Sequence, residues 1–247
     1  MNKKIMTKDW WPKNPDKCQK VFCQDFRELF NYFDLEKSKD FNFIFITDPP
    51  YNQGFKYDVY DDNLDHRDYL QLLGDIPSPR VIIHYPEETI NVLPKAFKDE
   101  LCDDVITWVY NGNLYKHSRS ISFWGIKPNY NRVKQPFKNL NDKRIQKLIE
   151  NGSQGARSYD WFNLPQVKNV SKEKTDHPCQ IPIEVFERII KLIVPENEYE
   201  KTVIIDPFCG SASSGVACQN LGLKYLGFEI SNYYFEIAKH NLGVELY

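Results

Sequence analysis

A short apolar stretch that ends in two prolines constrains the fold of this chain more than any other feature. Residues 41–52 read FNFIFITDPPYN, with the length and composition of a strand buried on both faces of a parallel sheet. Pro49 and Pro50 have no N–H to donate to a sheet ladder, so the strand must end at Asp48. The sequence therefore places Asp48 and Tyr51 at the carboxyl edge of a sheet, where open α/β sheets bind their ligands.

A second strand pattern ends in a turn of small residues. Residues 203–206 (VIID) run into PFCGSASSG at 207–215, and a helix is predicted at 213–221. Glycine and serine let the backbone approach a bound ligand closely at the start of a helix. The Asp-Pro-Pro-Tyr turn alone could be no more than the end of a strand. Two such strand ends with different chemistry indicate a binding site.

Together these residues resemble the S-adenosylmethionine-dependent DNA amino-methyltransferases. Residues 48–51 match the family's catalytic Asp-Pro-Pro-Tyr, and residues 206–211 match its cofactor motif, with Ala212 where glycine is usual. Residues 177–182 (HPCQIP) look like the family's His-Pro-Thr-Gln-Lys-Pro segment, with Ile181 in place of lysine. The catalytic motif precedes the cofactor motif, which is the permuted, beta-type order. The resemblance covers about residues 20–60 and 105–245.

The resemblance and the pattern of elements predict an α/β protein with a Rossmann-like methyltransferase fold. We expect a mostly parallel central sheet with helices on both faces, in a single domain over residues 1–247. Residues 127–174 show no strong strand pattern and one helix at 141–150, and are expected to be an inserted target-recognition segment. Residues 1–20 are expected to form an extended arm. Further helices are predicted at 24–33, 69–74, 87–100, 183–194 and 231–242, and further strands at 21–22, 80–85, 105–110, 121–126 and 224–229.

The resemblance implies methyl transfer to an exocyclic amino group of a DNA base. An aromatic amine is a weak nucleophile because its lone pair is delocalised. Hydrogen bonds to the Asp48 carboxylate and the Pro49 carbonyl would favour a pyramidal nitrogen. Pro50 completes the turn, and Tyr51 would stack on the base, which must be flipped out of the duplex. In the family an Asp at position 48 goes with adenine, so an adenine-N6 methyltransferase of a restriction-modification system is predicted, with cytosine N4 as the alternative.

S-adenosylmethionine is the cofactor that the resemblance implies, and its activated methyl group removes the need for a metal. Glu229 ends a predicted strand about 20 residues after the Gly-rich turn, where α/β nucleotide-binding units place an acid on the ribose hydroxyls. In the family an acidic residue near Asp25 lies by the adenine of the cofactor, although an Asp that begins a helix explains Asp25 equally well. The expected cofactor-binding residues are Asp25, Asp206, Phe208, Gly210, Ser211 and Glu229.

The charge distribution predicts double-stranded DNA as a partner. The chain has 32 Lys and Arg against 34 Asp and Glu, yet residues 116–174 carry 13 against 4, a net of +9 in a chain of net charge −2. A solvated surface would explain part of this charge, but a whole basic segment suggests a polyanion footprint. The family's base-contacting motif is matched in kind by Trp108, although a core position would explain that residue equally well. The expected DNA-contacting residues are Trp108, Arg119, Ser122, Lys134, Lys138, Lys143 and Arg144.

Other patterns argue against several classes of protein. Six cysteines lie without a CxxC pair, so neither a zinc site nor a disulfide framework is predicted. Cys179 stands in a Pro-Cys-Gln tripeptide like that of cytosine C5 methyltransferases, but there the tripeptide follows the cofactor motif, so Cys179 is not expected to be a nucleophile. No run approaches ~18 apolar residues, and the N-terminal residues lack the apolar centre of a signal peptide. These features predict a cytoplasmic protein without a membrane span.

Two other kinds of function stay open. A protein-glutamine or RNA methyltransferase would use a similar turn, but there it usually resembles Asn-Pro-Pro-Tyr placed after the cofactor motif. A catalytically silent DNA-binding subunit would be expected to lose Asp48 or Tyr51, and both are present. The recognition segment is short, which leaves room for a homodimer or a partner subunit.

Overall fold

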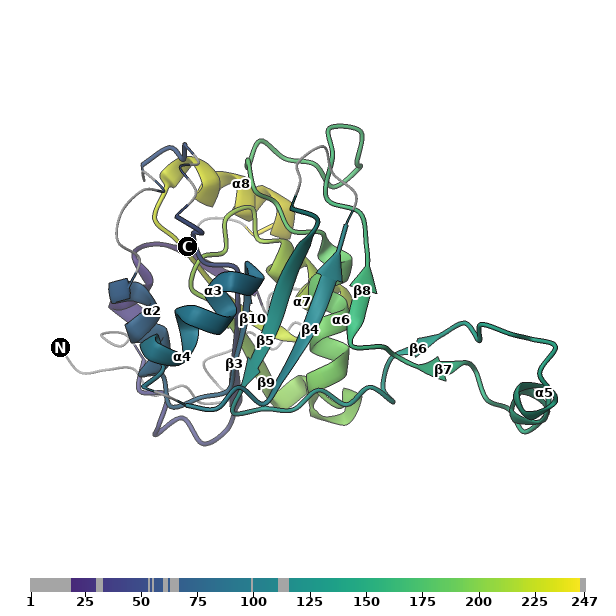
Figure 1. The fold of residues 1–247 in the computed structure, drawn as a ribbon. Coiled ribbons are helices and arrows are strands. Elements are labelled where there is room, and N and C mark those ends of the chain that lie inside the picture. Colours follow the sequence, from purple (N-terminus) through teal and green to yellow (C-terminus); the bar gives the residue numbers. More distant parts are fainter. Residues whose placement is uncertain are drawn as a thin grey trace.

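The computed structural model describes residues 19–29, 33–52, 54, 56–59, 62, 67–98, 100–110 and 116–244, and its centre is an eight-stranded sheet (Figure 1). In spatial order the strands are β1 (Gln19–Cys23), β10 (Lys224–Glu229), β9 (Thr202–Asp206), β2 (Asn42–Thr47), β3 (Arg80–His84), β5 (Ser118–Trp124), β4 (Asp104–Val109) and β8 (Trp161–Asn163). Neighbouring strands are parallel except that β5 is antiparallel to β3 and β4. The predicted α/β architecture with a mostly parallel sheet is therefore confirmed.

Strand β2 is buried on both faces, as the apolar run predicts. Ile44 and Ile46 belong to one apolar cluster, whereas Phe43 and Phe45 belong to a second cluster. Successive side chains of a strand point to opposite faces, so each face of β2 contributes to its own core. The parallel pairing of β2 with β9 brings the ends of the two strands to the same edge of the sheet.

Helices cover both faces of the sheet (Figure 1). The cluster that contains Ile44 is completed by α6 (Ile183–Ile193), α7 (Ser213–Leu221) and α8 (Asn232–Leu242). The cluster that contains Phe45 is completed by the 3-10 helix η3 (Phe26–Glu28), α2 (Arg67–Gly74) and α4 (Leu93–Ala96). A further 3-10 helix, η4 (Glu196–Lys201), precedes β9. The predicted helices at 183–194, 213–221 and 231–242 are confirmed.

The helix predicted at 87–100 is wrong in one respect, because the chain forms two short helices there. Helix α3 (Pro86–Asn91) ends before Val92, and Pro94 lies in the first turn of α4. A proline in the first helical turn loses no intrahelical hydrogen bond, whereas in the middle of a helix it would break one. Residues 30–32 of the helix predicted at 24–33 lie outside the described residues. Most of residues 1–20, predicted to be extended, and much of residues 53–68 lie outside them as well.

The predicted recognition segment contains a ribbon and helix that project from the body (Figure 1). Strands β6 (Lys134–Gln135) and β7 (Ala156–Arg157) pair antiparallel. Helix α5 (Lys143–Glu150) lies between them in the chain and forms the tip. We call residues 132–158 the arm. Residues 127–174 show no strong strand pattern in sequence, yet they include β8, which pairs in parallel with β4 at the edge of the main sheet. The division of the chain into domain and insertion stays a prediction.

Candidate active site

The two motifs meet because β2 and β9 are parallel neighbours. Asp48 directly follows β2, and Asp206 is the last residue of β9. The hydroxyl of Thr47 donates a hydrogen bond of 2.8 Å to Oδ1 of Asp206, which ties the two strand ends together. Ser214 in the first turn of α7 donates to Oδ2 of the same carboxylate at 2.5 Å. The sheet edge thus carries both turns side by side.

A cavity of about 370 Å³ opens at this edge. Its walls come from both predicted motifs, from the segment before α6, and from the ends of β1 and β10. The lining includes Asp25, Asp48, Pro49, Pro50, Tyr51, Asp206, Phe208, Gly210, Ser211 and Glu229. The structure therefore brings together all the residues that the sequence assigns to catalysis and to the cofactor.

Two tyrosine hydroxyls hold the turn at residues 48–51. The hydroxyl of Tyr69 donates to the carbonyl of Pro50 at 2.6 Å, and the hydroxyl of Tyr51 donates to Oδ1 of Asp48. The Tyr51 side chain is buried, and its ring lies edge-on to His84 with centroids 4.9 Å apart. A carboxylate accepts more than one hydrogen bond, so an amine can bind Asp48 alongside the phenol of Tyr51.

Burial raises the pKa of Asp48 to about 7, and the hydrogen bond from Tyr51 opposes that increase. An amine N–H needs an ionised carboxylate as its acceptor, so protonation of Asp48 removes the acceptor. We predict that kcat/KM for methyl transfer falls about tenfold for each pH unit below about 7, since kcat/KM reports the ionisation of the free enzyme. The profile is measured together with the cofactor Kd over the same range. If the cofactor Kd changes over the same pH range, the ionisation belongs instead to Asp206, whose pKa burial raises to about 6.

The cofactor turn has geometry that only a few residues tolerate. Gly210 has φ +52°, and a Cβ built on it would lie 2.7 Å from Nε2 of His177. Ala212, where the family has glycine, has φ 60° and is fully buried. The backbone of Ala212 therefore has the left-handed conformation, in which its Cβ crowds the following carbonyl at a cost of roughly 1–2 kcal/mol.

Glu229 organises the same turn from the next strand. Its Oε2 accepts from the backbone N–H of Gly210 at 3.0 Å, and its Oε1 accepts from that of Ser231 at 2.8 Å. Burial raises the pKa of Glu229, while these two hydrogen bonds oppose the increase. The carboxylate oxygens retain further acceptor capacity, as ribose hydroxyls would require. Asp25 also lines the cavity, and it caps η3 by accepting from the N–H of Arg27 at 2.9 Å.

Several residues that line the cavity were not assigned to the site from sequence. His177 packs edge-on against Tyr234 with ring centroids 4.6 Å apart, and burial lowers the pKa of His177 to about 4, so the imidazole is neutral near pH 7. Cys179 lines the cavity as well, and burial raises its pKa to about 11, which disfavours the thiolate that a nucleophile would need. Ile181 is buried and belongs to the apolar core. The HPCQIP match was the available signal for this wall.

Two of the residues expected to contact DNA are placed in the core instead. Trp108 is 1% exposed, and its indole N–H donates to the carbonyl of Leu164 at 2.9 Å. Ser122 is fully buried, donates to the carbonyl of Ile82 at 3.2 Å and accepts from the indole of Trp124. Their polar groups are satisfied inside the protein, so the expectation that they touch DNA is wrong for this conformation.

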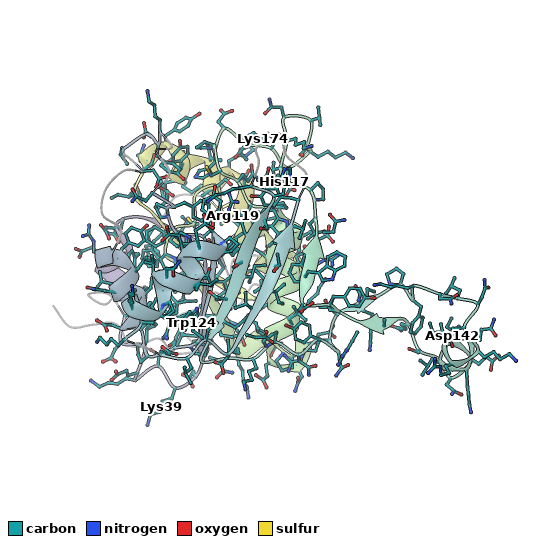
Figure 2. All side chains as sticks on the ribbon, in the orientation of Figure 1. Lys39, His117, Arg119, Trp124, Asp142 and Lys174 are labelled. Carbon is teal, nitrogen blue, oxygen red and sulfur yellow. The ribbon has the colours of Figure 1, made fainter. Side chains whose placement is uncertain are left out.

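The remaining expected DNA contacts fall into two groups. Arg119 is buried beside Tyr51, at the end of β5 nearest the cavity. Lys134, Lys138, Lys143 and Arg144 are exposed on the arm, and Figure 2 shows Asp142 at the arm's tip far from Arg119. The structure does not bring these four side chains to the cavity. Contact of these four residues with DNA stays a prediction, and it would lie away from the cavity.

The described ranges offer neither a cluster of metal ligands nor a membrane-spanning helix. Within those ranges, no cluster of three or more His, Cys, Asp or Glu side chains has an arrangement suited to a metal ion. No helix in the same ranges has the length and apolar character needed to cross a membrane.

Comparisons with known proteins identify the family of this chain. The N6_N4_Mtase family model, described as DNA methylase, matches residues 43–240. The type II methyltransferase M.HpaI of Haemophilus parainfluenzae is 29% identical over 224 residues, which cover 82% of this chain and 68% of that protein. The type II methyltransferase M2.LlaDCHI of Lactococcus lactis subsp. cremoris is 33% identical over 108 residues, which cover 42% of this chain but only 39% of that protein.

Solved structures share the fold. The M1.HpyAVI–SAM complex superposes with a TM-score of 0.59 at 20% identity and covers 92% of this chain and 100% of that chain. The cytosine-N4-specific PvuII DNA methyltransferase superposes with a TM-score of 0.63 at 12% identity and covers 90% of this chain and 86% of that chain. The family match extends over most of the chain and includes both motifs. The chain belongs to the N6/N4 family of DNA methylases.

Proposed function

We propose that this protein transfers the methyl group of S-adenosylmethionine to the N6 amino group of adenine in duplex DNA. The observation that carries the proposal is the cavity at which the Asp48 turn and the Gly210 turn meet. Two features of the chain fit the cofactor. Gly210, with φ +52°, lines the cavity in a tight turn that His177 packs against, and Glu229 supplies partly buried acceptor oxygens beside it. When bound, the cofactor supplies a methyl group already activated by its sulfonium.

The chain's own residues would then prepare the amine. The Asp48 carboxylate and the Pro49 carbonyl accept one N–H each, which localises the lone pair on the nitrogen and balances its developing positive charge. Asp25, Asp206, Phe208, Gly210, Ser211 and Glu229, which line the same cavity, would hold the cofactor. The reacting base has to leave the duplex to reach this cavity, at a cost of a few kcal/mol.

The choice of adenine is supported by Asp48, because the family pairs Asp at this position with adenine. Cytosine N4 is the second candidate, since its amine has the same hydrogen-bonding edge and a cytosine-N4-specific enzyme shares the fold. The relatives named above are type II methyltransferases, which supports a role in restriction-modification. Sequencing that detects modified bases on DNA from cells expressing this chain tests the proposal. We expect N6-methyladenine at one short sequence, and none with the Asp48→Ala variant.

The arm supplies a prediction about DNA affinity. We expect the quadruple change of Lys134, Lys138, Lys143 and Arg144 to Gln to weaken DNA binding and flatten its salt dependence. Each phosphate contact that is lost should reduce the log–log slope by about 0.9. Titrations of a labelled duplex at several salt concentrations measure the slope.

A matched control removes the same number of charges outside the arm. Lys37, Lys39, Lys98 and Lys201 are exposed on the body, and Lys39 lies at the end of the molecule opposite Arg119 (Figure 2). Their change to Gln should leave the slope near that of the unmodified chain. Equal effects of the two quadruple variants would show that the arm is not a specific DNA contact.

A further inference from the structure

Arg119 carries a positive charge in an enclosed position beside the catalytic turn. The side chain is 8% exposed and lies at the end of β5 that Figure 2 shows near His117, opposite Trp124. Its guanidinium donates to the hydroxyl of Tyr110, to that of Tyr85 at 3.0 Å and to the carbonyl of Ser118 at 3.1 Å. Burying a cation is costly unless a negative charge compensates it. This site therefore requires a source of compensation.

The immediate partners of Arg119 are neutral. Burial raises the pKa of Tyr85 and of Tyr110, so both phenols stay protonated near pH 7. None of the ion pairs among the described residues includes Arg119, and its buried Nε has no hydrogen-bond partner there. Aromatic faces supply part of the compensation, because the guanidinium carbon lies 3.8 Å from the ring centroid of Tyr85 and 4.9 Å from that of Tyr51. Among the residues that the structure describes, no carboxylate lies within ion-pair distance of the guanidinium.

The ring of Tyr51 connects this cation to the catalytic carboxylate. The guanidinium of Arg119 lies over the ring of Tyr51, and the hydroxyl of the same tyrosine donates a hydrogen bond to Asp48. We infer that Arg119 is a positioning residue of the catalytic turn: its guanidinium holds Tyr51 in place and supplies the positive charge that balances the Asp48 carboxylate. The inference rests on the proposed function, because it assigns Asp48 its role as acceptor.

The other groups that face Asp48 do not supply this charge. Asp206 at the end of β9 acts in the opposite direction and raises the pKa of Asp48, whereas Arg119 lowers it. Of the other described groups that interact electrostatically with Asp48, burial raises the pKa and favours the protonated form of Tyr51, Tyr57, Tyr85, Tyr110 and Cys179. The pKa of Asp48 is about 7 with Arg119 in place, so loss of that cation would leave Asp48 mostly protonated at neutral pH.

The test is a direct titration of Asp48. Protein labelled with 13C at the Asp carboxyl carbons is titrated by NMR, with the Asp48 resonance assigned from its absence in Asp48→Asn. In Arg119→Gln we expect the midpoint to rise by about one pH unit or more, the scale of losing a nearby opposite charge. The acid limb of kcat/KM should move by the same amount. In Arg119→Lys, which keeps the charge but loses the planar fork, the midpoint should stay near that of the unmodified chain while kcat falls.

Lys116→Gln is the matched control for charge. Lys116 lies over the ring of Tyr85 at 4.1 Å from its centroid but pairs with Glu87, so the change should leave the Asp48 midpoint in place. An unmoved midpoint in a folded Arg119→Gln would overturn the inference. Weaker DNA binding with an unmoved midpoint would instead make Arg119 a DNA contact. Should Arg119→Gln not fold, Arg119→Lys decides, since an unchanged kcat in that variant contradicts a positioning role. The NMR midpoint needs neither DNA nor methyl transfer, so it stands apart from a failure of the proposed function.

Discussion

Asp48→Ala is expected to lower kcat for methyl transfer by at least about 10²-fold, while the Kd of the cofactor stays within a factor of about two. The magnitude follows from the loss of one preorganised electrostatic group at the reacting atom. Asp48 lies at the end of β2, whereas the groups expected to hold the cofactor follow β9 and β10, so the carboxylate can be removed without dismantling that wall. Single-turnover rates measure the first quantity, and calorimetry with S-adenosylmethionine measures the second.

Asp48→Asn is the matched variant, because it keeps the size of the side chain and one acceptor oxygen but loses the charge. Intermediate activity is expected from it. Calorimetry that shows cofactor affinity collapsing together with activity in Asp48→Ala would make Asp48 a structural or cofactor-binding residue. The thermal unfolding midpoint of each variant separates such an effect from a general loss of folded protein.

Glu229→Ala is expected to weaken cofactor binding by roughly 1–3 kcal/mol, which corresponds to about 5- to 150-fold in Kd. The change removes the carboxylate proposed to bind the ribose hydroxyls. It also leaves the N–H groups of Gly210 and Ser231 without the acceptor that now fixes the turn. Isothermal titration with S-adenosylmethionine and with its demethylated product measures both affinities, and both should fall, because the ribose is common to the two ligands.

The control for this prediction is Glu236→Ala, an acidic residue on α8 whose side chain is 54% exposed. It has the same change of charge outside the cavity and should leave both affinities unchanged. Glu229→Gln retains an acceptor oxygen and should weaken binding less than Glu229→Ala. An unchanged dissociation constant in Glu229→Ala would rule out the ribose role.

Strands and helices with strong local patterns were predictable from the sequence. Helix 213–221 and strand 224–229 have the predicted bounds, because Gly222 ends the helix in a left-handed conformation and an apolar run follows at once. Strand β8 was missed, since it has three residues and only Phe162 points into the core. Its existence depends on pairing with β4, which lies far away in sequence.

Site residues were predictable from sequence where reactive side chains follow a predicted strand. They were less predictable where long-range packing determines which residues line the cavity. Asp48 and Gly210 follow strands, so the sheet itself brings them to one edge. His177 belongs to the wall because it packs where a Cβ on Gly210 would lie, a contact across 33 positions that no local pattern reveals. Trp108 and Ser122 lie on neighbouring strands of the sheet, but the sequence does not reveal that both side chains are buried in the core.

The methyl group is proposed to be transferred to N6 of adenine. The most direct test incubates duplex DNA of varied sequence with the purified chain and S-adenosylmethionine labelled in its methyl group, digests the DNA to nucleosides and identifies the labelled species by mass spectrometry. We expect label in N6-methyladenine, and none when Asp48→Ala replaces the unmodified chain. Label in N4-methylcytosine without N6-methyladenine would contradict the choice of base, and label absent from DNA but present in RNA or protein would contradict the proposed function itself.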